Sequence, residues 1–319
     1  MMDDRLHEQI REVLAKEGIE LFGFAPLPCP GELESILDDH YLDSLPKSLS
    51  YMKKPVWRDP RLFLPWAKSA VCVALPYNTT RESSAEHISR SKAWISRYAW
   101  GRDYHDLLRM KLKPVRSLLR ALGFMAKIAV DSFPVLERTL ARRAGLGFIG
   151  NNGLLINPDF GSYLFLGEVL TDAELPYTET LAMMCLDCAK CVSACPSGAL
   201  TGNCRVDPSL CVSSYNVEWK GEFPSTAPRF SGRLFGCDLC QEACPYNRSA
   251  PLSDEKGFEP GAGLFAPEMN LFLKGENDLL QALIKRTPLA RRGVQGLRLS
   301  AERIRRESQT KREETELSS

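Results

Sequence analysis

The sequence lacks several features that would each point to a class of protein. No apolar stretch approaches the roughly 18 residues of a membrane-spanning helix. The first residues have neither the apolar core of a secretory signal nor a twin arginine. The net charge of the 319 residues is only +1, and the four histidines are too scattered to suggest a metal site. We therefore expect a cytoplasmic protein without membrane contact, whose affinity for nucleic acid could only come from local patches.

Cysteine is what the chain has in abundance, and most of it lies in two runs. The run from Cys185 to Pro196 has the spacing C-x2-C-x2-C-x3-C-P of bacterial two-cluster ferredoxins, and the run from Cys237 to Pro245 reads C-x2-C-x3-C-P. In the ferredoxin pattern the fourth cysteine of a run binds the other cluster. The spacing predicts two [4Fe-4S] clusters in a ferredoxin-like domain that handles single electrons.

Two such clusters need eight ligands, and the two runs supply seven. Cys211 and Cys204 are candidates for the eighth. We favour Cys211, because the Val-Ser-Ser-Tyr stretch after it looks extended and could fold back on the second run. The predicted ligand sets are Cys185, Cys188, Cys191 and Cys244 for one cluster, and Cys195, Cys211, Cys237 and Cys240 for the other.

Other roles for the cysteines fit less well. Pairs of C-x2-C also build zinc ribbons, but a zinc site has no use for the C-x3-C-P ending. A disulfide framework is not expected in a chain of this length without a signal peptide. Cys72 lies in an apolar segment and should be buried as a small hydrophobe. Cys29 and Cys204 have no assigned role.

Hydrophobic periodicity predicts alternating helices and strands in the first half of the chain. The helices are expected at 6–14, 105–122 and 134–143, and the strands at 20–25, 69–75, 125–130, 154–156 and 162–170. This alternation is typical of a layered α/β domain. The fold class that we expect is α+β or α/β. It comprises a layered α/β domain over residues 1–175, the ferredoxin-like domain over 176–255, and a basic helical tail over 256–319.

Five further motifs carry a resemblance to a known family. They are DPRLFLP (59–65), SRYAWGRDYH (96–105), VDSFPVLE (130–137), RAGLGFIG (143–150) and INPDFGS (156–162). With the cysteine runs, and in this order, the sequence resembles the epoxyqueuosine reductases, in a short form without C-terminal helical repeats. That family reduces epoxyqueuosine to queuosine at the wobble position of tRNA. It uses a cobalamin bound in an α/β domain and two [4Fe-4S] clusters.

The resemblance implies a role for Asp131 as the proton donor of the reaction. Its position after a strand, beside Val130 and Phe133, is compatible with a raised pKa. The same residue could instead cap the helix expected to start near Pro134. The resemblance also implies cobalamin contacts, from Arg58, Ser96, Asp131, Leu155, Leu166, Ser213 and Asp238. Either leucine fits a plain core position nearly as well.

The motif D-x-H-x-x-G, known from other cobalamin proteins, is absent. Family members bind cobalamin without an axial histidine, so this absence does not oppose the resemblance. One departure is Asn151, where the family usually has lysine.

The implied partners are the tRNA anticodon loop with its epoxyqueuosine and an electron donor such as a ferredoxin or flavodoxin; we expect a monomer. Phosphate contacts should dominate the affinity for tRNA. Candidate residues are Lys220, Arg233, Arg286, Arg291, Arg292, Arg298, Arg303, Arg305 and Arg306.

Three alternatives remain open. A reductive dehalogenase also joins cobalamin to two clusters, but such enzymes usually carry an export signal. A diverged cobalamin reductase would act on another substrate. A ferredoxin-type electron carrier would bind no corrin.

Overall fold

The computed structural model describes residues 2–27, 38–57, 59–89, 91–186, 188–261 and 263–317, without the side chains of 2–4, 39, 40, 84 and 311–317. Arg58, a predicted cobalamin contact, and Cys29 lie outside the described residues. Within these ranges, no helix combines the length and the apolarity needed to cross a membrane.

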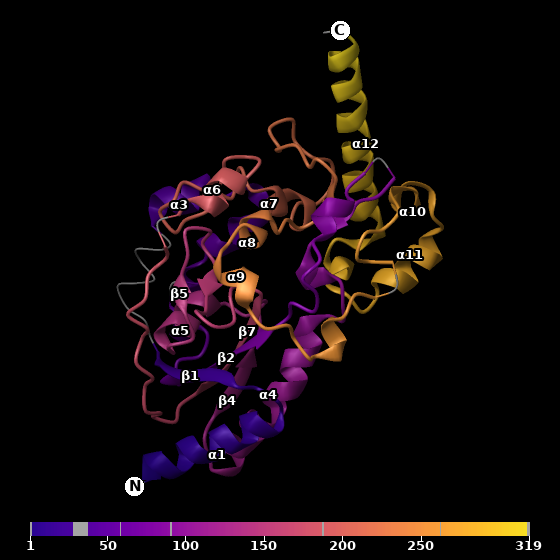
Figure 1. The fold of residues 1–319 in the computed structure, drawn as a ribbon. Helices are drawn as coiled ribbons and strands as arrows, with labels where there is room; N and C mark the ends of the chain where they lie inside the picture. The colour runs from indigo at the N-terminus through magenta and orange to yellow at the C-terminus, as the bar shows by residue number, and fades with distance from the viewer. Residues whose placement is uncertain are drawn as a thin grey trace.

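The chain folds into a mixture of helices and short strands, and its last helix projects from the body (Figure 1). The strands are β1 (Leu21–Pro26), β2 (Ser69–Pro76), β3 (Trp94–Ile95), β4 (Ala126–Ala129), β5 (Phe148–Ile149), β6 (Leu155–Ile156), β7 (Leu164–Thr171) and β8 (Arg233–Phe235). The α-helices are α1 (Met2–Lys16), α3 (Asp39–Ser44), α4 (Tyr104–Ala121), α5 (Glu137–Arg143), α6 (Lys190–Ala194), α7 (Val212–Asn216), α8 (Leu239–Glu242), α9 (Tyr246–Ser249), α10 (Met269–Lys274), α11 (Asn277–Ile284) and α12 (Gly293–Leu317). The prediction of a mixed fold is confirmed, since every predicted helix and strand has a counterpart in the structure.

The N-terminal half is built on a four-stranded sheet with the order β1-β2-β7-β4. Every neighbouring pair in this sheet is antiparallel. The central strands β2 and β7 are buried along nearly their whole length, as their apolar composition predicts. The alternation of helices and strands along the sequence does not determine whether neighbouring strands run parallel or antiparallel, because that depends on how the connections cross the sheet.

The two faces of the sheet pack against different helices. Val71 and Val169 point to the face covered by α1 and α4, whereas Ala70, Cys72 and Leu170 point to the face covered by α5. This is the period of two that a strand imposes. Cys72 is fully buried, as predicted.

The loop between β4 and α5 differs from the prediction. The helix begins at Glu137 rather than at Pro134, because the N–H of Val135 donates to the carbonyl of Phe133 at 2.8 Å in a tight turn. Asp131 has a φ of 50°, in the left-handed region. Among the described residues no side chain caps α5, so the alternative in which Asp131 caps this helix is wrong.

The segment after Cys211 also differs from the prediction. It is not extended but forms the helix α7, in which the N–H of Ser214 donates to the carbonyl of Cys211 at 3.0 Å and that of Val217 to Ser213 at 3.1 Å. Cys211 still lies near Cys237 of the second cysteine run, as predicted, but the segment that follows it is a helix and not an extended stretch.

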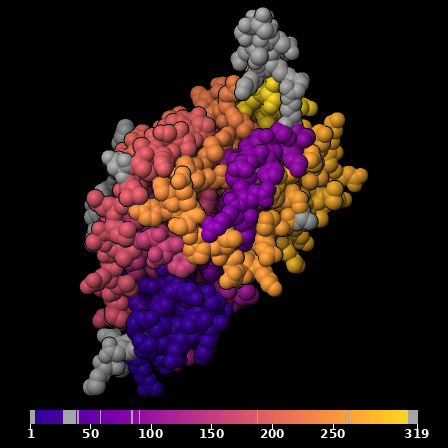
Figure 2. All heavy atoms as spheres, in the orientation of Figure 1, coloured from indigo at the N-terminus to yellow at the C-terminus, as the bar shows by residue number. Residues whose placement is uncertain are grey.

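A second apolar core joins segments from all three predicted ranges. Its largest members include Trp100, Phe230, Phe235 and Phe272. In Figure 2 the purple segment before α4 lies beside the yellow C-terminal helices, and the N–H of Ala93 donates to the carbonyl of Pro267 at 2.9 Å. The start of the C-terminal range is therefore packed into the body, although the boundaries at 175 and 255 stay predictions.

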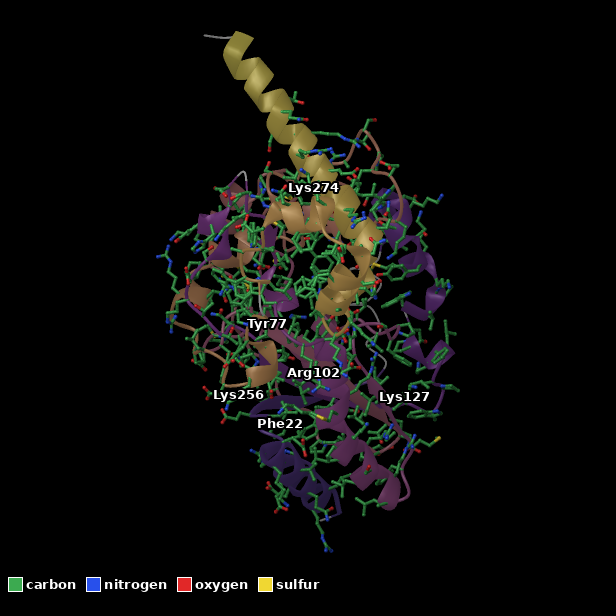
Figure 3. The ribbon with its side chains drawn as sticks, turned by 90° about the vertical axis from the view of Figure 1, so that its right-hand side faces the viewer. Phe22, Tyr77, Arg102, Lys127, Lys256 and Lys274 are labelled. Atoms are coloured by element: carbon green, nitrogen blue, oxygen red, sulfur yellow. The ribbon has the colours of Figure 1, made fainter. Side chains whose placement is uncertain are left out.

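Tyr77 connects the sheet to the cysteine-rich half. It follows β2 toward the middle of the molecule (Figure 3), where its ring stacks on Phe165 with centroids 4.2 Å apart. Its hydroxyl accepts a hydrogen bond from Gln241 of α8 at 3.4 Å. The sheet thus supports the second cysteine run directly.

Candidate active site and cluster sites

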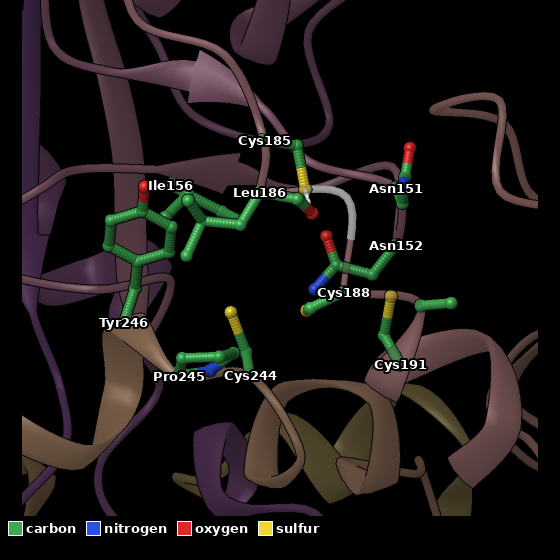
Figure 4. Close-up of a pocket in the computed structure, with 11 residues that line it drawn as sticks. Asn151, Asn152, Ile156, Cys185, Leu186, Cys188, Cys191, Cys244, Pro245 and Tyr246 are labelled. Carbon is green, nitrogen blue, oxygen red and sulfur yellow. Dashed lines mark hydrogen bonds between the residues drawn. The ribbon is translucent and has the colours of Figure 1, made fainter.

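Four cysteines line a single pocket, namely Cys185, Cys188, Cys191 and Cys244. The first three come from the first turn of α6 and the segment that leads into it, and the fourth lies between α8 and α9. In Figure 4 the sulfur atoms of Cys185 and Cys244 point into the opening from opposite sides. The structure therefore brings together the residues predicted for one cluster, although Cys244 belongs to the second run and the other three to the first.

The other four predicted ligands also lie together. They are Cys195 at the end of α6, Cys211 before α7, Cys237 before α8 and Cys240 within α8. Burial raises the pKa of Cys237 to about 11, and the thiol of Cys211 adds to the shift. Burial also raises the pKa of Cys240, followed by the charges of Cys237, Cys211 and Cys195. Thiolates gathered in this way need bound cations to become stable.

Cys204 stands apart from the second set. It is exposed, and its sulfur lies 3.5 Å from the carbonyl oxygen of Ile149 and 3.5 Å from Oδ1 of Asn151. Burial raises the pKa of its thiol, and the charge of Cys185 adds to this. Of the two candidates for the eighth ligand, the structure places Cys211 with the second set and Cys204 at the edge of the first.

Asp131 lies in the loop after β4, with its side chain 42% exposed. Its Oδ2 is 3.1 Å from Nε2 of His105 and 4.0 Å from Nη1 of Arg291. Burial alone would raise the pKa of Asp131, but His105, Arg291 and a hydrogen bond from Tyr104 together lower it. The predicted raised pKa is therefore wrong, because the sequence did not reveal the cations that fold against this carboxylate.

His105 is held between two carboxylates at the start of α4. Its Nδ1 lies 2.7 Å from Asp103, the N-cap residue of the helix, and its Nε2 faces Asp131. Burial lowers the pKa of His105, but the two carboxylates outweigh this and raise it to about 9. The ring is thus an imidazolium at neutral pH, with both nitrogens engaged. Sequence reasoning missed His105; its only signal was the spacing Asp-x-His inside a family motif.

Two further carboxyl groups lie behind Asp131, one half-buried and one fully buried. Glu137 accepts a hydrogen bond from the backbone N–H of Asp131, and burial followed by the charge of Asp131 raises its pKa. Glu168 on β7 is fully buried, and neither of its carboxyl oxygens has a hydrogen-bond partner in the described structure. Burial, then the charge of Glu137, raises the pKa of Glu168. Neither residue was predicted from the sequence.

Three predicted cobalamin contacts gather around the second cysteine set. Asp238 is buried beside Cys237, and it accepts hydrogen bonds from the hydroxyl of Ser96 and, at 2.6 Å, from the N–H of Arg97. Burial raises the pKa of Asp238. Burial likewise raises the pKa of the Cys211 thiol, and hydrogen bonds from Ser213 oppose this rise.

Tyr98 lies between this group and Asp131. Burial raises the pKa of Tyr98, and the charges of Glu218, Asp238 and Asp131 raise it further. Its ring also packs near Phe235, with centroids 5.8 Å apart. The acid–base residues and the second cysteine set therefore border the same region.

The two predicted leucine contacts belong to the apolar layer under α5. Leu155 is 3% exposed, and the partly buried Leu166 packs against the same layer. Their burial agrees with the core alternative, and their role as cobalamin contacts stays a prediction.

Two arginines predicted to bind tRNA point inward. Arg292 is 6% exposed with its guanidinium over Phe223, and Arg233 is 7% exposed over Trp94. Their assignment to a surface patch is wrong, because apolar neighbours cover both side chains. Arg291 pairs with Glu218 at 2.7 Å and lies 4.0 Å from Asp131, so the C-terminal range contributes a cation to the candidate active site.

The residues present fit the implied groups. Each cysteine set offers thiol donors suited to iron–sulfur clusters. Both ring nitrogens of His105 are engaged by carboxylates, so this imidazole is not available as an axial cobalt ligand. Ser213 is half-buried and offers a hydroxyl to the amide rim of a corrin. Ser96 and Asp238 are 2% and 1% exposed and hydrogen-bond each other, so their contact with a corrin stays a prediction.

A mixed fold with two cysteine sets, the second of which borders an acid–base pair, defines the class of iron–sulfur redox proteins. A family model described as "Epoxyqueuosine reductase QueG, DUF1730" matches residues 58–132, and one described as "4Fe-4S double cluster binding domain" matches residues 184–247. The prediction of two [4Fe-4S] clusters is confirmed, and zinc is not supported.

The epoxyqueuosine reductase of Synechocystis sp. is 37% identical over 226 residues, which cover 69% of this chain and 77% of that protein. The chain belongs to the epoxyqueuosine reductase family. The enzyme of Escherichia coli is 37% identical over 227 residues, but the match spans only 60% of its length and 70% of this chain. A crystal structure of epoxyqueuosine reductase with an epoxyqueuosine-modified tRNA stem loop has a TM-score of 0.83 at 28% identity, covering 94% of this chain and 80% of that one.

Proposed function

We propose that this chain reduces epoxyqueuosine to queuosine in tRNA. The observation that carries the proposal is the pair of Asp131 and the protonated His105, which borders the second cysteine set in a chain of this family. The reaction consumes two electrons and two protons, and it converts the epoxide oxygen into water. A redox centre and a proton source are therefore needed side by side.

We further propose that the two cysteine sets described above are the ligands of the two clusters. The support is that each set lies together and apart from the other. Cys188, from the first set, is exposed, as is Met184, which precedes Cys185. This exposure favours the first cluster as the entry point for electrons from a ferredoxin or flavodoxin.

The cobalamin would be held by Ser96, Leu155, Leu166, Ser213 and Asp238. Arg58, which lies outside the described residues, stays a predicted contact. When bound, it would supply a low-potential reductant that single electrons can regenerate. The chain's own contribution is to position this group and to keep water from its reactive face.

Proton supply falls to Asp131 and His105 together. Because the pKa of Asp131 is lowered and that of His105 is raised to about 9, the transferable proton rests on His105 at neutral pH. Asp131 would receive this proton and pass it to the oxygen that leaves the substrate. Arg291 would hold the carboxylate in place between turnovers.

Binding of tRNA would rely on arginines that remain exposed, such as Arg305 and Arg306 on α12. Their contacts with phosphate would weaken as the salt concentration rises. We expect the monomeric chain to suffice for turnover.

A turnover assay tests the proposal. The protein is reconstituted anaerobically with iron, sulfide and cobalamin, and a low-potential reductant and tRNA containing epoxyqueuosine are added. Mass spectrometry of the nucleosides should show queuosine formed only when cobalamin is present. No conversion despite full iron and bound corrin would favour another substrate, and the absence of corrin binding as well would leave an electron carrier.

A further inference from the structure

Asn152 places an amide beside the first cysteine set. It lies in the turn after β5, is 3% exposed, and lines the pocket formed by Cys185, Cys188, Cys191 and Cys244. Its Nδ2 is buried without a hydrogen-bond partner in the described structure. A buried donor left unpaired destabilises the folded state, so its position needs an explanation.

The turn fixes which end of the amide faces the pocket. Oδ1 of Asn152 accepts a hydrogen bond from the N–H of Leu154 at 3.2 Å, and the N–H of Gly150 donates to the carbonyl of Leu154 at 2.9 Å. Rotating the amide would set its NH2 group against the N–H of Leu154. In Figure 4 the nitrogen of Asn152 points toward the opening between the cysteines.

The acceptor that this donor faces is sulfur. The pocket belongs to the double-cluster domain, and its four thiols are the sulfur ligands that we propose for the first cluster. Hydrogen bonds to cluster or ligand sulfur tune the reduction potential, because they stabilise the more negative reduced state more than the oxidised state.

We propose that Nδ2 of Asn152 donates a hydrogen bond to a sulfur of the cluster held by the first set and raises its reduction potential. This makes the first cluster a better acceptor for incoming electrons. The inference depends on the cluster domain and not on the substrate.

The test uses two variants of the reconstituted protein. Asn152→Ala removes the donor without adding charge, and Asn152→Asp keeps the oxygen that accepts from Leu154. Redox titration followed by electron paramagnetic resonance should show one of the two potentials lowered in both variants. A tenfold change in the reduction equilibrium corresponds to about 59 mV for one electron.

Asn151→Ala is the matched control, since Asn151 lines the same pocket but its Oδ1 lies 3.5 Å from the sulfur of Cys204 rather than against the first cysteine set. It should leave both potentials unchanged. In protein with 15N-labelled asparagine side chains, pulsed resonance should detect 15N coupling at the reduced cluster in wild type and in Asn151→Ala but not in Asn152→Ala. Unchanged reduction potentials in both Asn152 variants at full iron content, or the absence of 15N coupling in wild type, would refute the proposal and leave Asn152 with only a structural role in the turn. Because no tRNA is used, either result leaves the proposed activity to its own assay.

Discussion

Replacing His105 by glutamine should make the stability of the protein less dependent on pH. The imidazolium of His105 lies between Asp103 and Asp131, at 2.7 and 3.1 Å, and its side chain is only 16% exposed. Glutamine can still form hydrogen bonds to these carboxylates, but it carries no charge. The variant therefore isolates the contribution of the protonated ring.

The magnitude follows from the pKa. Raising it from 6.5 to about 9 favours the protonated ring in the folded state, by about 3 kcal/mol at about 1.36 kcal/mol per pH unit. A raised pKa stabilises the fold fully below pH 6.5, and the contribution is lost as pH rises through about 9. The free energy of unfolding of wild type should therefore exceed that of His105→Gln by the largest amount below pH 6.5 and by the smallest amount above pH 9.

The assay is urea unfolding of the anaerobically reconstituted protein, followed by tryptophan fluorescence between pH 6 and 9.5. His87→Gln is the control, because it removes an imidazole that pairs with one partly exposed carboxylate, Glu82. Such a pair contributes about 0–1 kcal/mol. A difference between wild type and His105→Gln that stays constant across this pH range would refute the reasoning.

Three other outcomes follow from the site. Asp131→Asn should lower turnover by about 10²–10⁴-fold without changing iron or corrin content, as measured by nucleoside mass spectrometry, because it removes the proton carrier; undiminished turnover would contradict this role. Cys211→Ser should lose roughly half of the iron while Cys204→Ser keeps it, and iron loss in the second variant would overturn the ligand assignment. The pKa of Glu168 is raised above 4.5, so the protonated carboxyl stabilises the fold and wild type should lose stability as pH rises above that value, whereas Glu168→Gln should not. Urea unfolding at pH 5 and pH 8 measures whether the stability of wild type relative to Glu168→Gln falls between the two values; an unchanged difference would contradict the prediction.

Residue spacing along the chain was enough to predict the elements and the kind of metal chemistry. An uninterrupted apolar run placed β2, and a helical pattern placed α4, each within a residue or two, because burial is written into local composition and spacing. The cysteine runs likewise predicted two clusters, because most ligands of one cluster lie within a short loop.

Which groups meet at the active site depended instead on how distant segments pack. Asp131 and His105 are 26 positions apart, and Arg291 comes from the C-terminal range, yet His105 and Arg291 together lower the pKa of Asp131. The choice of Cys211 over Cys204 and the burial of Glu168 depend equally on packing between distant segments. Charge interactions and desolvation act through space, so no spacing along the chain could reveal them.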